Sequence, residues 1–301
     1  SIMGVVLDLD GDMDYILGNQ GRNNKLRYDS THPVIQYAKD FDGNGSLDLL
    51  TSHYVNGEYR PFNVRNDLTK QIKTLSKIYK DYKSYAEANT NDVISHLDTS
   101  GAQIFRLHTL ETSILWNNNQ RFSLESLPYN AQFSNTNGIL IKNLDDNLYP
   151  DIITVGNDYG TEVFTGRTDA GIGQVILNDG NEFTSLPPYH SGFYAPGNTR
   201  GILEIMLESI KRSTLIVGRN NNKPLFYDLN IDQKFVEISN GTVYLLIKTE
   251  NEDQYKVEHY KGSGYQSQQG SRFHFRADQV IEVISVDYQG NQSTLYADEN
   301  I

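Results

Sequence analysis

Residues 40–51 read DFDGNGSLDLLT, an oxygen-rich loop followed by an apolar, strand-like run. Oxygen-bearing side chains occupy every second position of the loop: Asp40, Asp42, Asn44, Ser46 and Asp48. Gly43 and Gly45 lie between them and allow the backbone to wrap. Calcium takes about six to eight oxygen ligands from a flexible loop of this kind, whereas magnesium demands a tighter octahedron. The stretch therefore predicts a calcium site.

The loop is similar to the first half of an EF-hand but departs from it at the end. An EF-hand loop carries a bidentate Glu at its twelfth position. Thr51 stands at that position here, and the residues after Asp48 read as a strand. We therefore expect a calcium loop between strands, with no helix-loop-helix.

A similar loop occupies residues 143–155, which read NLDDNLYPDIITV. Its candidate ligands are four side chains and one main-chain carbonyl: Asn143, Asp145, Asn147, Asp151 and the carbonyl of Tyr149. Leu148 replaces the turn glycine and the ligands carry fewer charges. We expect calcium to bind more weakly here than at residues 40–48.

The earliest copy of the loop, residues 8–17, reads DLDGDMDYIL. It offers four candidate ligands: Asp8, Asp10, Asp12 and Asp14. Two alignments of this loop with the other copies are possible. If Asp14 closes the loop, the first ligand position falls on Val6, and if Asp8 comes first, the closing position falls on Ile16. Either alignment loses one ligand.

Short strand-like runs separated by turn residues follow these loops. Residues 113–116 and 174–177 each precede an Asn- or Gly-containing turn and then a Phe, which predicts two hairpins. Further strand runs lie at 243–248, 272–275 and 280–286. Many short strands with turns at both ends predict an all-β repeat fold.

The segment 64–95 is the exception to this β pattern. Apolar residues recur there at steps of three and four, with lysines between them: Leu68, Ile72, Leu75, Ile78, Tyr79, Tyr82 and Tyr85. This spacing predicts an amphipathic helix that begins near Asp67 and ends near Asn89. The apolar stripe either packs on the protein's own sheet or docks a partner.

Composition excludes several classes of function. The 301 residues carry a net charge of −12, which argues against nucleic-acid and anionic membrane surfaces. Cysteine is absent, so no disulfide, zinc–thiolate site or Cys nucleophile is present. No apolar run is long enough to span a bilayer. A motif so close to Ser1 indicates a fragment or a processed product of a longer protein.

The loops resemble the FG-GAP or VCBS repeats of integrin-type β-propellers, whose pattern is Asp-x-Asp-x-Asp-Gly-x-x-Asp. Several stretches are also similar to bacterial relatives of cartilage acidic protein. They are residues 40–94, the Gly-Asn pair at 156–157, the Gly-Arg pair at 166–167, Gly192, and the sequence LIVGRNN at 215–221. The tail, GSGYQS at 262–267 and RFHF at 272–275, resembles the ASPIC/UnbV domain. Departures are the shortened first loop, Leu148, and a tail without the usual Trp-Pro.

This resemblance implies a fold, a division of the chain and a location. It implies propeller repeats over 1–235, with the helical insertion at 64–95, and an ASPIC/UnbV-like β domain over 236–301. The protein would be exported to the bacterial cell surface or outer membrane, with a lipid anchor on a missing N-terminal part, or else to the periplasm.

No catalytic motif accompanies these features, so we expect no enzyme activity. The chain has seven histidines but no metalloprotease His pair, nucleophile elbow or phosphate loop. Three functions stay open. The first is a surface binding or scaffold subunit of an outer-membrane assembly, such as a SusC/SusD-like nutrient-uptake system. The second is a free-standing module that binds a glycan, and the third, less favoured, is a polysaccharide hydrolase.

Overall fold

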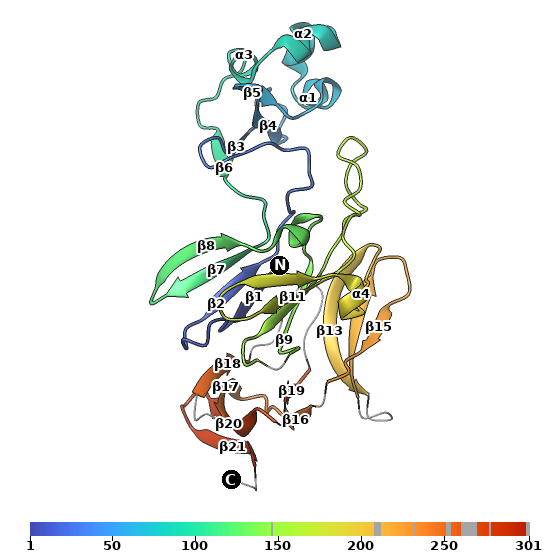
Figure 1. Ribbon diagram of the computed structural model, residues 1–301. Helices are drawn as coiled ribbons and strands as arrows, with labels where there is room; N and C mark the ends of the chain where they lie inside the picture. Colours follow the sequence, from blue (N-terminus) through green and yellow to red (C-terminus); the bar gives the residue numbers. More distant parts are fainter. Residues whose placement is uncertain are drawn as a thin grey trace. The chain divides into compact units, whose positions relative to one another are not determined.

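The computed structural model describes residues 1–145, 147–207, 212–231, 233–250, 254–259, 270–276 and 278–298. Antiparallel β-sheets are the main regular structure, with 43% of residues in strands and 11% in helices (Figure 1), which confirms the all-β prediction at the level of fold class. The chain forms two compact units. We call Lys25–Leu110 the inserted unit, and Ser1–Asn24 together with Glu111–Ile301 the main unit. No helix in the described ranges is long and apolar enough to cross a membrane.

The first sheet of the main unit is completed by strands far apart in the sequence. Its strands, in the order β1-β2-β7-β8, are Ile2–Val5, Asp14–Leu17, Ser113–Asn118 and Arg121–Ser126. The whole inserted unit lies in the chain between β2 and β7, which pair directly at Leu17 and Ser113. Asn119 and Gln120 both have positive φ in the β7–β8 turn, as a tight hairpin requires. The predicted hairpin at 113–122 is thus confirmed.

Two further sheets follow in the main unit. The second, in the order β12-β11-β10-β9, contains β9 (Gly138–Lys142), β10 (Asp151–Val155), β11 (Gln174–Asn178) and β12 (Phe183–Leu186). The third, in the order β13-β14-β15, contains β13 (Thr199–Leu207), β14 (Arg212–Arg219) and β15 (Leu225–Asp228). The hairpin predicted at 174–183 is confirmed. Two short helices, η2 (Tyr129–Gln132) and α4 (Pro188–Ser191), lie in the connections.

The second sheet is buried on both faces. On one face Ile152 and Ile176 pack against Ile16 and Ile114 of the first sheet. On the other face a separate core includes Ile153, together with Ile202 and Val217 of the third sheet. All five residues of β10 are buried as a result. Each core therefore joins two sheets that succeed one another in the chain.

The last part of the main unit is β-rich, as the sequence indicates. One sheet pairs β16 (Lys234–Glu237) with β19 (Arg272–Phe275). The other, β18-β17-β20-β21, contains β17 (Thr242–Thr249), β18 (Gln254–Glu258), β20 (Val280–Asp287) and β21 (Gln292–Ala297). The three strand runs predicted here are confirmed. The motif at 262–267 lies outside the described residues, and the domain boundary at 235 stays a prediction.

The inserted unit combines one sheet with short helices. The sheet, in the order β5-β4-β3-β6, contains β3 (Val34–Lys39), β4 (Asp48–Val55), β5 (Glu58–Pro61) and β6 (Gln103–Leu107). The helices are α1 (Arg65–Gln71), η1 (Lys73–Lys77), α2 (Tyr82–Glu87) and α3 (Thr90–Ile94). The single helix expected over this segment is therefore wrong. The backbone is extended at Ile72 and Ala88, and Asn89 caps the start of α3.

The apolar stripe of this helical segment packs mostly on its own sheet. Leu68, Ile72, Leu75 and Tyr85 share a core with Leu50 of β4, which confirms the first of the two alternatives for these side chains. Ile78 and Tyr82 do not belong to the buried stripe, since they are 40% and 61% exposed. The five lysines between the apolar positions are exposed: Lys70, Lys73, Lys77, Lys80 and Lys83.

Candidate metal centre

The loop of residues 40–48 joins β3 to β4 in the inserted unit. Lys39, the last residue of β3, pairs with Asp48, the first of β4, so the loop is anchored at both ends. Gly43 and Gly45 have φ values of +72° and +85°, which other residues rarely adopt. Their N–H groups donate to the Asp40 carboxylate, each at 2.8 Å. The bond from Gly45 does most to lower the pKa of Asp40, so this carboxylate stays ionised.

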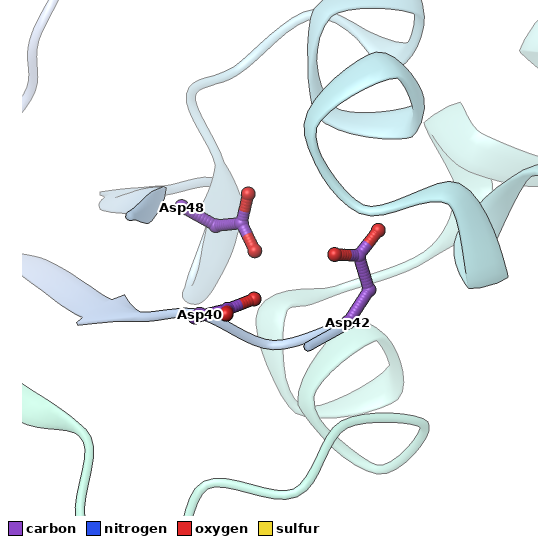
Figure 2. Close-up of side chains that lie close together, drawn as sticks. All are labelled: Asp40, Asp42 and Asp48. Atoms are coloured by element: carbon purple, nitrogen blue, oxygen red, sulfur yellow. The ribbon is translucent and has the colours of Figure 1, made fainter. Parts of the chain in front are cut away.

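Three carboxylates of this loop converge. One oxygen of each of Asp40, Asp42 and Asp48 lies within 4.8 Å of the others, and Figure 2 shows the three side chains around one space. Within the described ranges, no other group of three acidic, His or Cys side chains meets in this way. Like charges so close together repel, and a bound cation removes the repulsion.

The carboxylates at this centre are partly buried and only partly hydrogen-bonded within the described part of the chain. Asp48 is 1% exposed, and its Oδ2 accepts the N–H of Phe41 at 2.9 Å. Burial, and then the charges of Asp42 and Asp40, raise the pKa of Asp48. Asp42 Oδ1 is buried without a hydrogen-bond partner among the described residues. Calcium prefers such hard oxygens, so these residues fit the ion that the sequence predicts.

The helical segment holds Asp42 in place. The backbone N–H of Lys73 donates to Asp42 Oδ2 at 3.1 Å, and the side-chain oxygen of Gln71 accepts the N–H of Leu49 at 3.1 Å. η1 therefore contacts the loop at Asp42, and α1 contacts the start of β4. Sequence reasoning missed both contacts, because neither Gln71 nor the Lys73 backbone carries a recognisable ligand signal.

All three Asp-rich loops share one hydrogen-bond pattern. In each, the closing Asp accepts a backbone N–H from seven residues earlier: Leu7 to Asp14 (3.0 Å), Phe41 to Asp48 (2.9 Å) and Leu144 to Asp151 (2.7 Å). A second bond is also common to the three loops. The residue four positions before the closing Asp accepts, through its side-chain oxygen, the backbone N–H of the residue two positions after it. The donor and acceptor are Asp12 and Asp10 (3.0 Å), Ser46 and Asn44 (2.8 Å), and Tyr149 and Asn147 (2.8 Å). Asp14 therefore closes the earliest loop, and Val6 occupies its first ligand position.

The loops in the main unit differ from residues 40–48 at the closing carboxylate. Its second oxygen accepts an N–H from the next strand of the same sheet: Asn117 to Asp14 (2.9 Å) and Asn178 to Asp151 (2.8 Å). Asp8 Oδ1 accepts the N–H of Asp10, and Asp12 Oδ2 accepts that of Asn119. In these loops backbone donors therefore engage both oxygens of the closing carboxylate, whereas only one oxygen of Asp48 accepts a backbone N–H among the described residues.

Side-chain amides occupy further oxygens of the loop at 143–151. The Asn147 amide donates to Asp145 Oδ2 at 3.1 Å, and the Asn143 amide donates to the carbonyl of Asn147. Asp146 lies outside the described residues. The structure thus brings three carboxylates together at residues 40–48. In the other two loops most candidate ligands accept protein donors, but Asp12 Oδ1 and Asn143 Oδ1 are buried without a partner among the described residues.

We expect Asp151 to make the stability of the calcium-free protein depend on pH. Burial raises the pKa of Asp151 to about 6, above the 3.8 of an unperturbed Asp. A group whose folded-state pKa is raised stabilises the protein fully below about pH 4, and this contribution is lost as the pH rises through 6. The native protein should therefore lose up to about 3 kcal/mol of unfolding free energy between pH 4 and 7 through this group. Asp151→Asn carries no ionisable group at this position, so the variant should lack this part of the pH dependence.

Urea unfolding in chelator at both pH values checks this expectation. The difference in unfolding free energy between native and variant protein should change with pH. A difference of the same size at pH 4 and pH 7 contradicts it.

No protein-family model matches the chain, and no curated protein matches it. The resemblance to propeller repeats therefore rests on the residues quoted for it.

Proposed function

We propose that the chain is a non-enzymatic, calcium-stabilised protein of the propeller-repeat kind that acts as a surface binding or scaffold subunit. The observation that carries the calcium part is the convergence of Asp40, Asp42 and Asp48, with a buried Asp42 oxygen that has no partner among the described residues. An ion there neutralises three carboxylates and links the loop to the helical segment.

The arrangement of the sheets supports the propeller-repeat part of the proposal. Propeller blades are four-stranded antiparallel sheets, and the sheets that contain β1, β3 and β9 have four such strands each. In each of the three, the Asp-rich loop joins two neighbouring antiparallel strands: β1 to β2, β3 to β4 and β9 to β10. β1 and β9 are edge strands, whereas β3 and β4 form the central pair of their sheet. Successive sheets of the main unit share cores, as neighbouring blades do.

Metal content tests the calcium part. Protein dialysed against micromolar calcium should retain one calcium ion per chain, measured by elemental analysis. Asp42→Asn should retain none, whereas Asp145→Asn, at the same loop position in residues 143–151, should retain one. Magnesium in excess should not displace the ion. Native protein that retains no calcium would overturn this part of the proposal.

The partner is proposed to be a cell-surface or outer-membrane protein, with a glycan as the alternative. The observation that favours a protein is the row of exposed lysines on the helical segment of an acidic chain, because local charge contrast steers association. Charge reversal at Lys77 and Lys80 should leave folding intact and weaken capture of a defined partner from bacterial outer membranes.

Two charge reversals elsewhere, at the exposed Arg121 and Lys223, provide a matched control and should have no effect. If all forms instead bind polysaccharide equally and retain no membrane protein, the glycan alternative holds. A third outcome is that the protein hydrolyses a polysaccharide and loses this activity when one carboxylate outside the Asp-rich loops is changed. That result would contradict both binding functions and identify a hydrolase.

A further inference from the structure

The strand β8 forms an open edge of the first sheet, since it ends the strand order β1-β2-β7-β8 (Figure 1). All six residues of β8 are exposed, including Phe122 at 57% and Leu124 at 50%. The pairing of β8 with β7 is continuous, without a bulge, and the strand contains no proline or lysine. Bulges, prolines and lysines are common features that keep an edge from pairing with another chain. β8 therefore presents a regular edge that can accept a further strand.

The turn between β7 and β8 determines which backbone groups of β8 face this edge. Asn118 and Arg121 pair across a two-residue turn, and residues at this place in such a hairpin exchange two backbone hydrogen bonds. Arg121 and every second residue after it therefore bond to β7. The N–H and C=O groups of Phe122 and Leu124 point to the open edge, where a further strand would bond to them.

The sequence of β8 is complementary to itself when two copies run antiparallel. With Ser123 on the twofold axis, Phe122 of each copy lies opposite Leu124 of the other, and Arg121 lies opposite Glu125. Cross-strand pairs of opposite charge and of apolar side chains stabilise a sheet. The two nearest registers that keep the backbone bonds either place Arg121 opposite Ser123 or leave it beyond the strand. One register is therefore preferred.

The charged side chains of β8 lie on one face of the sheet. Arg121 and Glu125 share this face, because they are four residues apart on a strand. Trp116 Nε1 donates to Glu125 Oε2 at 2.7 Å, so the Glu125 carboxylate is already held in position. Two pairs of opposite charge would form in a dimer, one on each side of the axis.

The apolar side chains of β8 continue a row on the other face of the sheet. Leu124 pairs with Leu115 of β7, which pairs with Tyr15 of β2. Neither Leu115 nor Tyr15 belongs to the core between the first and second sheets. Because Phe122 would lie opposite Leu124 of the second copy, the apolar row would continue across the axis.

The corresponding outer strands of the next two sheets lack this complementarity. β12 reads FTSL and carries no charge, and β15 reads LFYD and carries a single Asp. Phe226 of β15 is nevertheless 60% exposed. An exposed aromatic side chain on an edge strand is thus shared by β8 and β15, whereas opposite charges placed symmetrically occur in β8.

We propose that two copies of this chain associate through antiparallel pairing of their β8 strands. The contact is isologous, with the same strand on both sides of a twofold axis, and it joins the two first sheets into one. Stable interfaces bury about 1,200–2,000 Å². A single pair of short strands buries less, so the dimer should be weak, with a dissociation constant in the micromolar range. The contact lies in the main unit and does not depend on the calcium loop.

Sedimentation velocity with charge-reversed variants tests the proposal. The native chain should dimerise as its concentration rises through the micromolar range. Arg121→Glu and Glu125→Arg each place like charges opposite one another, so each variant alone should dimerise about tenfold more weakly. A mixture of the two variants places opposite charges together again and should associate more tightly than either variant alone. A native chain that stays monomeric at about 100 micromolar would overturn the dimer, and a mixture that associates no better than its components would overturn the register.

A pair of exposed phenylalanines locates the contact on β8. Phe122→Lys should fold, because the side chain is exposed, and should be monomeric where the native chain is dimeric. Phe226→Lys makes the same change on the edge strand β15 and should dimerise as the native chain does. Equal losses in the two variants would contradict the placement. A monomeric native chain that loses capture of an outer-membrane protein on Phe122→Lys would assign this edge to a strand of that protein and overturn the second copy.

The proposed dimer contact is separate from the lysine row of the inserted unit. Arg121→Glu leaves those lysines unchanged, so a monomeric form should still capture the outer-membrane partner.

Discussion

Calcium is expected to raise the melting temperature of this protein, and Asp42→Asn is expected to abolish the rise. An ion that binds only the folded state stabilises it by mass action, by about 2.7 kcal/mol at a free concentration one hundred times its dissociation constant. Asp42 has a buried oxygen that lacks a partner among the described residues, and its other oxygen accepts the N–H of Lys73. Removing its charge therefore affects the ion and the position of the helical segment together.

Thermal unfolding with and without chelator measures this effect. The same substitution at the equivalent position of the other two loops provides the control. Asp8→Asn and Asp145→Asn change the residues equivalent to Asp42 in the other two loops. These variants should keep most of the calcium-dependent rise, since backbone or amide donors already bond to those carboxylates. If protein shown by elemental analysis to be free of calcium melts at the same temperature as loaded protein, calcium does not stabilise the fold.

Gly156→Ala is expected to destabilise the main unit by about 3 kcal/mol or more. A Cβ atom at Gly156 would lie 1.9 Å from the carbonyl oxygen of Asn135 and 2.7 Å from the backbone nitrogen of Asn137. Both neighbours are backbone atoms, and the Asn137 nitrogen is held by a hydrogen bond to Val155. Relief of the clash therefore requires a backbone shift, which places the cost at the upper end of overpacking penalties.

Gly218 gives the matched control for this substitution. It also lies at the end of a central strand, but the nearest atom to a Cβ there is the carbonyl oxygen of Gly201 at 3.8 Å. Gly218→Ala should change the unfolding free energy by less than about 1 kcal/mol. Urea denaturation of both variants measures the difference. Equal effects at the two glycines would show that chain entropy, and not close approach, governs these positions.

Much of the secondary structure could be predicted from local sequence. Each Asp-rich loop is followed by a strand, and the two turns rich in Asn and Gly mark hairpins, because these signals depend on a few neighbouring residues. The helical segment shows where local reasoning fails. Spacing by three and four residues continues through Ile72 and Ala88, where the backbone is extended. Asn89 is as suitable at the start of a helix as after its end, and the structure uses it as a start.

The candidate metal centre could be predicted in part, for the same reason. Alternating oxygens at residues 40–48 bring three carboxylates together because the loop itself sets their positions. The contact of Lys73 with Asp42 depends on how the helices pack. The pair of Lys142 with Glu204 depends on which strands become neighbours. Neither contact leaves a signal in the sequence, since the residues involved are far apart along the chain.

The position of the inserted unit between β2 and β7 sets an order of events during synthesis. β2 is synthesised before the segment Lys25–Leu110, and its partner at Ser113 is made only after that segment. At about 5–20 residues per second, this delay lasts on the order of ten seconds. The inserted unit has its own core around Leu50 and can fold during that time. The β1–β2 hairpin lacks β7 during this interval, so Ile16 cannot yet pack against Ile114 and stays exposed to solvent.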